Sequence, residues 1–448
     1  MVSPTPDYWE TRQHELRKTR VVMIDGRLST NTSTVEAGAS TRVRRGGYWG
    51  FASAPDTDPV PLRDLALRNA QAMSRFGARD ETALAEGSYR GEHEFRGRAP
   101  LGSKDNLERL AALQAYCQQQ FPSLASVRLM AQEETHRKRL ATSGGSDALS
   151  CIQRAMVYVF LAAQDAQGAP IEVFDRLSCR GGFADLDLSV DSVAPLLQTM
   201  HQHLQAKRHA VPARGGVHTV VMAPVLAGML AHEAMGHPCE ADLVLAGAVT
   251  GELVGQRVAS DLVSMVDFAH HHGDAEVQMP VYVDDEGSPA RDAVLIERGI
   301  LRQFMTSRET ASRLGIASTG SARAYGPNDE PLVRMRNTAI LPGTSKLDAM
   351  IAGVEDGYLL AGTSNGQADS TTEFMFGINL GYEIKNGQLG RAIRDTTVSG
   401  SAIKVLSSVD AVSDDMQWSC AGYCGKKQPM VVSMGGPALR ARAHLGGE

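Results

Sequence analysis

Two histidines that flank a glutamate give this chain its clearest capacity for chemistry. His232, Glu233 and His237 lie within residues 231–237, which read AHEAMGH. Neutral imidazole nitrogens are common zinc ligands, and a neighbouring carboxylate can take a proton from a water that the metal activates. The residues therefore predict a catalytic zinc site. Their spacing is one residue longer than in the HExxH motif, in which the histidines stand at positions i and i+4 of a helix.

The extra residue constrains the backbone between the two histidines. Successive residues of a regular α-helix are rotated by about 100°, so that positions i and i+5 point about 140° apart. A helix whose histidines share one ion must therefore bulge or unwind between them. Gly236 gives the backbone freedom at this point, and Pro238 disfavours helical geometry at His237. We expect the helix to end or to be distorted at the second histidine.

The alternative interpretation is a surface helix that carries two histidines by chance. The preceding residues argue against it, because 220–231 are almost wholly apolar and lead directly into His232 and Glu233. Ionisable side chains are seldom buried unless they are paired or bind a metal. The position of the motif therefore favours a buried metal site.

A catalytic zinc usually has three protein ligands and one position for water. The candidates for the third ligand are Cys239, Glu240, Asp242, Cys420 and Cys424. Cys239 follows His237 so closely that reaching the same ion would strain the backbone, whereas carboxylates such as Glu240 complete several kinds of zinc site. Cys424 lies in a segment that we expect to be a flexible loop. Cys420 and Cys424 are equally compatible with a disulfide or with buried thiols, so the sequence alone leaves the third ligand open.

The composition limits the class of protein. The chain has 448 residues, of which 43% are hydrophobic and 21% charged, as in globular proteins of about two or three domains. A net charge of −6 does not indicate the basic surface that is typical of proteins that bind nucleic acid. Short basic clusters at 42–45 and 136–139 are expected to be solvated faces of strands or turns.

Targeting signals and cysteine usage indicate the compartment. The first residues lack the basic and apolar regions of a secretory signal, and the apolar run 220–231 is too short to span a bilayer. Six cysteines are too few for a disulfide framework in a chain of this length. We expect a cytoplasmic protein with reduced thiols that contacts neither a membrane nor nucleic acid directly.

The elements that position the site follow from the spacing of apolar residues. In the first half, the expected strands are 19–24, 39–43, 48–52, 127–134, 136–143, 148–162 and 171–179, and the expected helices are 60–76, 107–121 and 191–207. In the second half, a strand at 217–222 leads into the helix that carries His232 and His237, which we call the metal helix. The remainder is rich in glycine and in strands, with helices expected at 307–314 and 346–356.

These elements predict an α+β protein. We expect an N-terminal α/β domain over 1–205, in which helices flank a β-sheet. A C-terminal domain over 217–448 is expected to be mostly antiparallel β, barrel-like, and to carry the metal helix. The polar, turn-rich residues 206–216 are the predicted linker.

Over essentially its whole length the chain resembles the TldD/PmbA family of zinc metallopeptidases, specifically the metal-bearing TldD branch. The resemblance rests on HEAMGH at 232–237, with Glu240 and Asp242 after it, and on short blocks in the same order. These blocks are DG at 25–26, WGFAS at 49–53, VDDEG at 283–287, TGSAR at 319–323, RMRNT at 334–338, KNG at 385–387, CGK at 424–426 and GGP at 435–437.

The resemblance implies a zinc site with His232, His237 and Cys424 as ligands and Glu233 as general base. It also implies that unfolded or short peptides reach the site through a narrow channel, and that the chain forms a heterodimer with a metal-free paralogue, or a homodimer. The chain departs from the family pattern Cys-Gly-Lys-x-Gly-Gln, since residues 424–428 read CGKKQ and are one glycine short. The sequence therefore does not define the path of this loop, although it retains the cysteine.

Other polar residues are candidates for supporting roles. Arg323, Arg334 and Asn337 are candidate binders of the substrate backbone or of an oxyanion, and the alternative is that they satisfy buried turns. The acidic run 284–286 before Gly287 is expected to end a hairpin rather than to bind calcium. The triple histidine at 270–272 is expected to be a solvated loop.

The favoured function is hydrolysis of peptide bonds by a water that zinc activates, with Glu233 as general base. One alternative is a peptide-binding or scaffold subunit of a TldD-like complex, which would not need Glu233. Another is a hydrolase specialised for a natural-product biosynthetic pathway. The family has also been labelled a modulator of DNA gyrase, but the acidic charge and the lack of a DNA-binding motif argue against direct contact with DNA.

Overall fold

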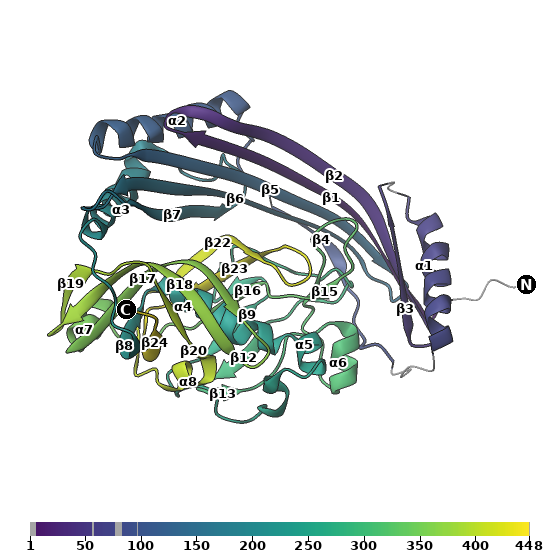
Figure 1. Cartoon of the computed structure of the whole chain (residues 1–448). Coiled ribbons are helices and arrows are strands. Elements are labelled where there is room, and N and C mark those ends of the chain that lie inside the picture. Colours follow the sequence, from purple (N-terminus) through teal and green to yellow (C-terminus); the bar gives the residue numbers. More distant parts are fainter. Residues whose placement is uncertain (1–5, 56–57, 77–82, 96, 448) are drawn as a thin grey trace, which may run out of the picture.

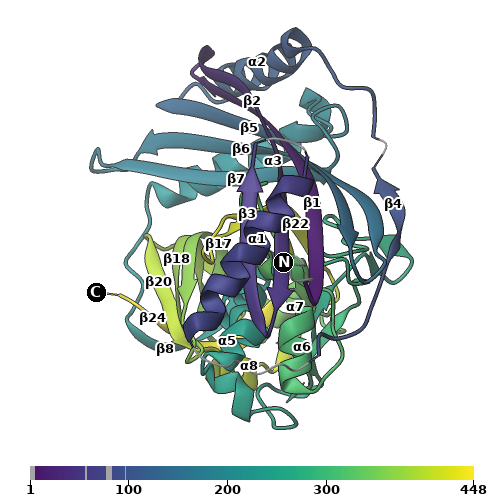
Figure 2. The same ribbon diagram turned by 90° about the vertical axis from the view of Figure 1, so that its right-hand side faces the viewer.

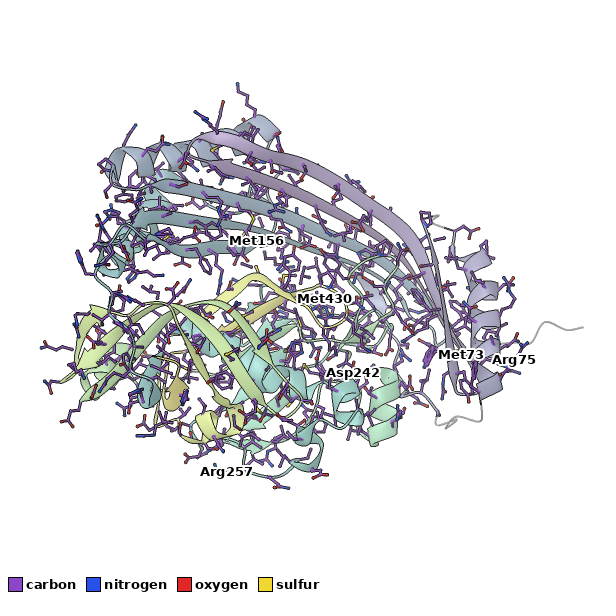
Figure 3. All side chains as sticks on the ribbon, in the orientation of Figure 1. Met73, Arg75, Met156, Asp242, Arg257 and Met430 are labelled. Carbon is purple, nitrogen blue, oxygen red and sulfur yellow. The ribbon has the colours of Figure 1, made fainter. Side chains whose placement is uncertain are left out.

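A long curved sheet from the N-terminal half of the chain arches over the C-terminal half (Figure 1). The computed structural model describes residues 6–55, 58–76, 83–95 and 97–447. Side chains fill the space between the arch and the half beneath it, with Met156 on the sheet and Met430 on a strand below (Figure 3). The α+β class expected from the sequence is confirmed.

The arched sheet has the strand order β3-β2-β1-β5-β6-β4, and β7 also pairs with β6. Its strands are β1 (Tyr8–Ile24), β2 (Arg27–Arg45), β3 (Tyr48–Ala54), β4 (Arg90–Glu94), β5 (Ser126–Thr142), β6 (Asp147–Gln164) and β7 (Pro170–Arg180). The first hairpin turns at Asp25 and Gly26, whose φ angles of 49° and 79° are those that a two-residue turn between right-twisted strands requires. The Asp-Gly turn expected from the sequence is therefore present.

Helices cover the two ends of the outer face of this sheet. α2 (Ser103–Gln120) and α3 (Val190–Lys207) lie at one end, and α1 (Val60–Met73) packs on β2 and β3 at the other (Figures 1 and 2). Leu113 of α2 and Leu197 of α3 are fully buried with Val157 of β6 in the apolar core between the first two helices and the sheet. The expected sheet with flanking helices is confirmed.

The strands of the arch are longer than the sequence indicated. β1 begins at Tyr8 rather than at residue 19, and the two strands expected at 127–134 and 136–143 form the single strand β5. The part of β1 that the sequence did not predict, residues 8–18, carries charged residues on the face toward the C-terminal half, including the buried Arg12. The partners of Arg12 lie far away in the sequence, so that a pattern of apolar alternation could not reveal this part of the strand.

A barrel-like sheet forms one side of the C-terminal half. Its strands close into a ring in the order β17-β8-β24-β20-β18, because β17 and β18 also pair with each other. They are β8 (Gly216–Met222), β17 (Asp356–Ala368), β18 (Glu373–Lys385), β20 (Thr396–Ser401) and β24 (Leu439–Leu445), with β19 (Gln388–Ala392) outside the ring beside β18 and β21 (Ala411–Val412) beside β24. All pairs of the ring are antiparallel except β8 with β17, so the expected barrel-like, mostly antiparallel sheet is confirmed.

A second C-terminal sheet has the strand order β13-β12-β9-β16-β23-β22. Its strands are β9 (Met265–Phe268), β12 (Ala293–Glu297), β13 (Ile300–Leu301), β16 (Asn337–Ile340), β22 (Gln417–Cys424) and β23 (Met430–Gly436). The short helices are α4 (Pro224–Met229), α5 (Ala241–Leu245), α6 (Arg308–Leu314), α7 (Leu347–Ala352) and α8 (Ala402–Ser407). α4 packs closely on β23, where Gly228 faces Gly435 without side chains to separate them. This contact holds α4, the first segment of the helix that carries His232 and His237, against the sheet.

Buried ion pairs join the arch to the C-terminal half. Arg42 is 7% exposed; its Nε lies 2.8 Å from a carboxylate oxygen of Glu10, and its Nη2 bonds to Glu286. Nζ of Lys138 lies 2.6 Å from Asp285. The prediction that the basic clusters at 42–45 and 136–139 are solvated is thus wrong for these side chains, because the acidic turn neutralises them. That turn does end a tight hairpin, as expected, but its carboxylates are buried.

The connection between the halves is short. α3 ends at Lys207 and β8 begins at Gly216, so the helix includes the first residues of the predicted linker. The division into domains 1–205 and 217–448 stays our proposal. Among the described residues, no helix is both long and apolar enough to cross a membrane.

We expect Arg42→Met to destabilise the protein by about 3–5 kcal/mol, because the substitution leaves the buried carboxylates of Glu10 and Glu286 without their shared cation. Denaturant unfolding measures this change. The control is Arg45→Met, which removes a half-exposed pair with Asp7 and is expected to cost about 0–1 kcal/mol. Equal stabilities of the two variants would contradict a stabilising role for the buried pairs.

Candidate metal centre

The helix that carries both histidines changes its winding between them. α4 continues into a π-helix over Leu230–Gly236, which is followed by a 3₁₀ turn over His237–Cys239. The backbone N–H of His237 donates to the carbonyl of His232, an i to i+5 bond. This wider turn brings the two histidines onto one face. The distortion expected from the long spacing is confirmed.

Gly236 and Pro238, the residues at the distortion, have different structural roles from those that the sequence predicted. Gly236 has φ −64° and ψ −53°, and His237 has φ −58° and ψ −50°, which are ordinary helical values. Pro238 was expected to disfavour helical geometry at His237, and these angles show that His237 is nevertheless helical. Gly236 instead provides space, because a methyl group there would overlap the sulfur of Met335. Pro238 stands in the first turn of the 3₁₀ segment, where its missing N–H costs nothing.

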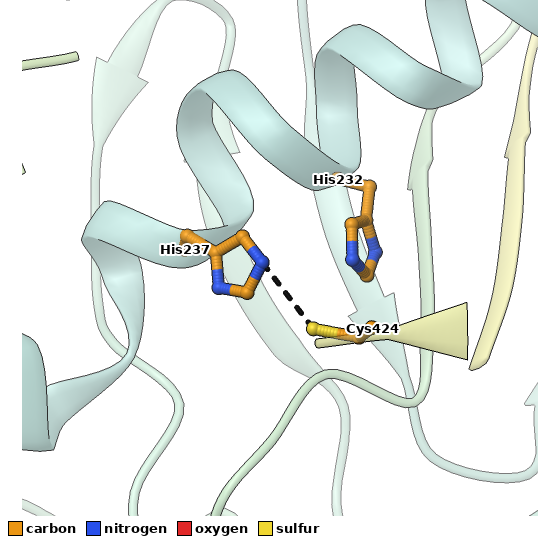
Figure 4. Close-up of side chains that lie close together, drawn as sticks. All are labelled: His232, His237 and Cys424. Carbon is orange, nitrogen blue, oxygen red and sulfur yellow. Dashed lines mark hydrogen bonds between the residues drawn. The ribbon is translucent and has the colours of Figure 1, made fainter. Parts of the chain in front are cut away.

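Two histidines and one cysteine converge at this point (Figure 4). His232, His237 and Cys424 each offer one ligand atom, and these atoms lie within 4.8 Å of one another. Nε2 of His237 is 3.3 Å from Sγ of Cys424. His232 is 1% exposed, yet neither of its ring nitrogens has a hydrogen-bond partner among the described residues. A buried imidazole without partners is costly, and a metal ion between the three side chains would satisfy it.

Charges within the cluster favour the thiolate that a metal requires. Burial alone would raise the pKa of Cys424, but the neighbouring imidazoles of His232 and His237 lower it to about 4. Burial likewise disfavours the imidazolium of His237, and the charges of Glu240 and Cys424 outweigh burial and raise its pKa well above the ordinary value. Two imidazoles and a thiolate are a donor set that zinc accepts.

Glu240 orients His237 rather than joining the three donors. It is fully buried, and its Oε2 lies 2.8 Å from Nδ1 of His237 and 3.1 Å from Nζ of Lys426. Burial would raise the pKa of Glu240, but Lys426 and then His237 lower it to about 2. Because the ionised carboxylate only accepts hydrogen bonds, Nδ1 carries the proton and Nε2 is left for a metal. Among the candidates for the third ligand, the structure therefore brings Cys424 to the histidines.

Glu233 lies at the edge of the cluster. Its Oε2 is 3.7 Å from Nε2 of His237, and its side chain is 19% exposed. A carboxylate that borders the donor atoms and reaches solvent is placed to exchange protons with water at the site.

The remaining cysteines stay apart from this cluster. Cys424 is the last residue of strand β22, not part of a loop as expected, and Cys420 is buried within the same strand. Cys239 is also buried, and burial raises the pKa of its thiol to about 12. The cysteines, all of which lie in described parts of the chain, are free thiols, so Cys420 and Cys424 do not form a disulfide.

The three candidate substrate-binding residues are buried and bond to the protein's own backbone. Arg323 donates to the carbonyl of Met335 at 2.7 Å, and Asn337 donates to the carbonyl of Met279 at 2.8 Å. Arg334 is fully buried and donates to the carbonyl of Cys424 at 2.7 Å. The same guanidinium also bonds to the carbonyls of Lys426 and Gln428. Arg334 thus fixes the segment that bears the cysteine.

The sequence offered Glu240 as a possible third ligand and assigned no role to Lys426. Only the fold shows that these two side chains meet behind His237. The triple histidine, expected to be a solvated loop, is a half-buried hairpin of β10 (His271–His272) and β11 (Ala275–Glu276), in which His270 stacks on Tyr282.

The fold and the donor set define an α+β protein with a candidate metal site of two histidines and one cysteine. The family model described as the PmbA/TldA metallopeptidase C-terminal domain matches residues 215–445, and that of domain 1 matches residues 9–73. A protein of Methanothermobacter thermautotrophicus named metalloprotease is 30% identical over 98% of this chain and 96% of its own. The chain therefore belongs to the TldD/PmbA metallopeptidase family.

Other relatives carry similar names. A zinc metalloprotease TldD homolog of Saccharolobus solfataricus is 29% identical over 72% of this chain and 71% of its own.

TldE from Thermococcus kodakarensis has a similar solved structure, with a TM-score of 0.76 and 18% identity over 97% of this chain and 96% of that one. A putative modulator of DNA gyrase from Bacteroides thetaiotaomicron, also 18% identical, matches 99% of this chain and 95% of its own with a TM-score of 0.75. These structural likenesses establish the fold alone.

We expect Glu240→Gln to weaken zinc binding by about 10–100-fold, because the amide no longer fixes the Nδ1 proton of His237 as a charged acceptor does. Competition with a chromophoric chelator measures the affinity. Asp242→Asn is the matched control: Asp242 also pairs with Lys426 but has no bond to His237, so the affinity should change by less than about threefold. A similar loss in both variants would indicate that Lys426, not Glu240, governs the site.

Proposed function

We propose that the chain is a zinc-dependent peptidase that hydrolyses unfolded or short peptides. The observation that carries the proposal is the convergence of His232, His237 and Cys424 beside the carboxylate of Glu233. A protein that only binds or supports a partner would need no such carboxylate at the edge of a donor set. The names of the relatives, metalloprotease and zinc metalloprotease TldD homolog, support the same function.

The identity of the ion rests on the chemistry of the donors. Two imidazole nitrogens and one thiolate leave one position of a tetrahedral ion free, which is the arrangement of catalytic zinc sites. When bound, zinc would supply a Lewis acid for the scissile carbonyl and acidify water. The thiolate donates more charge than a third imidazole, so the ion would be a weaker Lewis acid than one held by three histidines.

The residues of the chain have separate tasks in this proposal. Glu233 takes a proton from the attacking water and later delivers it to the leaving amine. Glu240 keeps His237 in the tautomer that presents Nε2, and Arg334 holds the backbone of Cys424. The base is thus accessible to solvent, while the groups that hold the donors are buried.

We also propose that the protein acts in the cytoplasm, as a heterodimer with a metal-free paralogue or as a homodimer. The support for this assembly is the family resemblance of the sequence. A scaffold subunit and a hydrolase specialised for a biosynthetic pathway are the competing functions, and cleavage assays with and without the paralogue separate them.

We expect Glu233→Gln to keep about one zinc ion per chain and to lose cleavage by about 10²–10⁴-fold, because the isosteric amide cannot accept the proton. Metal analysis and hydrolysis of an unfolded casein, with and without the metal-free paralogue, measure both properties. Cys424→Ser should instead lose the zinc, since it removes one donor of the cluster.

The outcomes of this experiment are distinct. Zinc in the wild-type protein without cleavage of any unfolded peptide, even with the paralogue, would favour the scaffold or a specialised substrate. A wild-type protein that binds no metal would refute the proposed function.

A further inference from the structure

The strand that ends in Cys424 is an edge strand of the C-terminal half. Within the described residues β22 pairs only with β23, and this pairing slips between Ser419 and Gly422. The slip leaves Cys420 and Ala421 without register partners in the sheet, and the ladder resumes at Gly422, which pairs with Val432. Since β22 supplies a donor of the metal cluster, whatever holds this irregular segment also holds the donor.

The arched N-terminal sheet supplies those missing partners. Nη1 of Arg154, on β6, donates to the carbonyl of Gly422 at 2.7 Å and to that of Cys420. The hydroxyl of Tyr158, also on β6, donates to the carbonyl of Ala421. Ser178 of β7 accepts from the N–H of Cys420 at 3.2 Å. The irregular part of β22 is therefore completed by the other half of the chain.

A buried carboxylate holds Arg154 in place. Arg154 is 1% exposed and Glu134, on β5, is fully buried, with Oε2 of Glu134 at 3.1 Å from Nη2 of Arg154. The same carboxylate accepts from the hydroxyl of Tyr423, the residue before Cys424, at 2.6 Å. Its other oxygen accepts from Tyr325 at 2.5 Å. Glu134 thus connects the arch to the cysteine strand through Tyr423 and to another segment of the C-terminal half through Tyr325.

We propose that Glu134 and Arg154 are positioning residues for the metal centre, which set the affinity for zinc by fixing β22 and hence Sγ of Cys424. The proposal rests on the proposed function only in that the cluster binds zinc. Arg334 holds the carbonyl of Cys424 from the C-terminal half, and Arg154 holds that of Gly422 from the arch. A metal site tolerates displacements of about 0.5 Å in its ligands, so a donor at the end of an edge strand needs both supports.

A purely structural role for the pair predicts a different result. Buried ion pairs often add little net stability, and replacing both partners by neutral groups of similar volume is frequently neutral. If Glu134 and Arg154 only join the two halves, their joint replacement affects global stability at most and leaves the metal affinity of the folded protein unchanged. A positioning role changes the affinity of the folded protein itself.

The test is the double variant Glu134→Gln/Arg154→Met of the full chain, which leaves no lone buried charge. We expect its zinc affinity, measured by chelator competition, to fall by about tenfold or more, as for other groups that orient metal ligands. With cobalt in place of zinc, the thiolate-to-metal charge-transfer band should weaken or shift, because this band reports the bond to Cys424.

The matched control is Lys138→Met/Asp285→Asn, which removes another buried ion pair between the arch and the C-terminal half that does not touch β22. It should keep the wild-type zinc affinity and cobalt spectrum. Tyr423→Phe, which removes only the hydroxyl bonded to Glu134, provides a gentler variant if the double variant does not fold, with a smaller loss expected.

Wild-type zinc affinity and an unchanged cobalt spectrum in folded Glu134→Gln/Arg154→Met would overturn the positioning role, while leaving the proposed peptidase intact. An equal loss in the Lys138/Asp285 control would also overturn it, since docking of the halves alone would explain the effect. A wild-type chain that binds no zinc would instead refute the function on which the proposal rests.

Discussion

The candidate metal centre depends on one backbone hydrogen bond, from the N–H of His237 to the carbonyl of His232. A regular helix would separate these side chains by more than a third of a turn, and the i to i+5 bond removes that separation. The close approach of Met335 to Gly236 packs the widened turn, and the contact of Gly228 with Gly435 holds the preceding segment α4 against β23. The two histidines are therefore held on one face of the helix by the π-turn, by the close packing at the two glycines and by the sheet behind them.

A second constraint is the neutralisation of charge between the two halves. The concave face of the arch carries Arg12, Arg42, Lys138 and Arg154, whose charges would be expensive to bury alone. Backbone carbonyls of the C-terminal half accept hydrogen bonds from these side chains, and the acidic turn at 284–286 forms ion pairs with them. Each of these side chains bonds to the other half, although Glu10 and Glu134 of the arch itself also neutralise Arg42 and Arg154. These directional bonds specify the relative placement of the halves more sharply than apolar contact would.

Much of this was accessible from the sequence. The α+β class, the Asp25-Gly26 turn, the helices of the first half and the distortion between His232 and His237 follow from periodicity, turn chemistry and helical geometry. The family blocks pointed to Cys424, which spacing alone could not select from the other candidates. What could not be predicted depends on contacts between distant residues. Strands whose buried face is charged, such as the first part of β1, show no apolar alternation, and Glu240 gains its role only through its position behind His237.

The wide separation of the donors along the chain bears on when the centre can form. Two donors are neighbours on one helical turn, whereas the third, Cys424, follows His237 by 187 residues. During synthesis the histidines emerge long before the cysteine, and the edge strand β22 has its bonding partners, the arch and β23, on segments from opposite ends of the sequence. An ion held by all three side chains could therefore be bound only after Cys424 has been synthesised. A chain that stops before Cys424 carries an incomplete donor set and would lack the proposed chemistry.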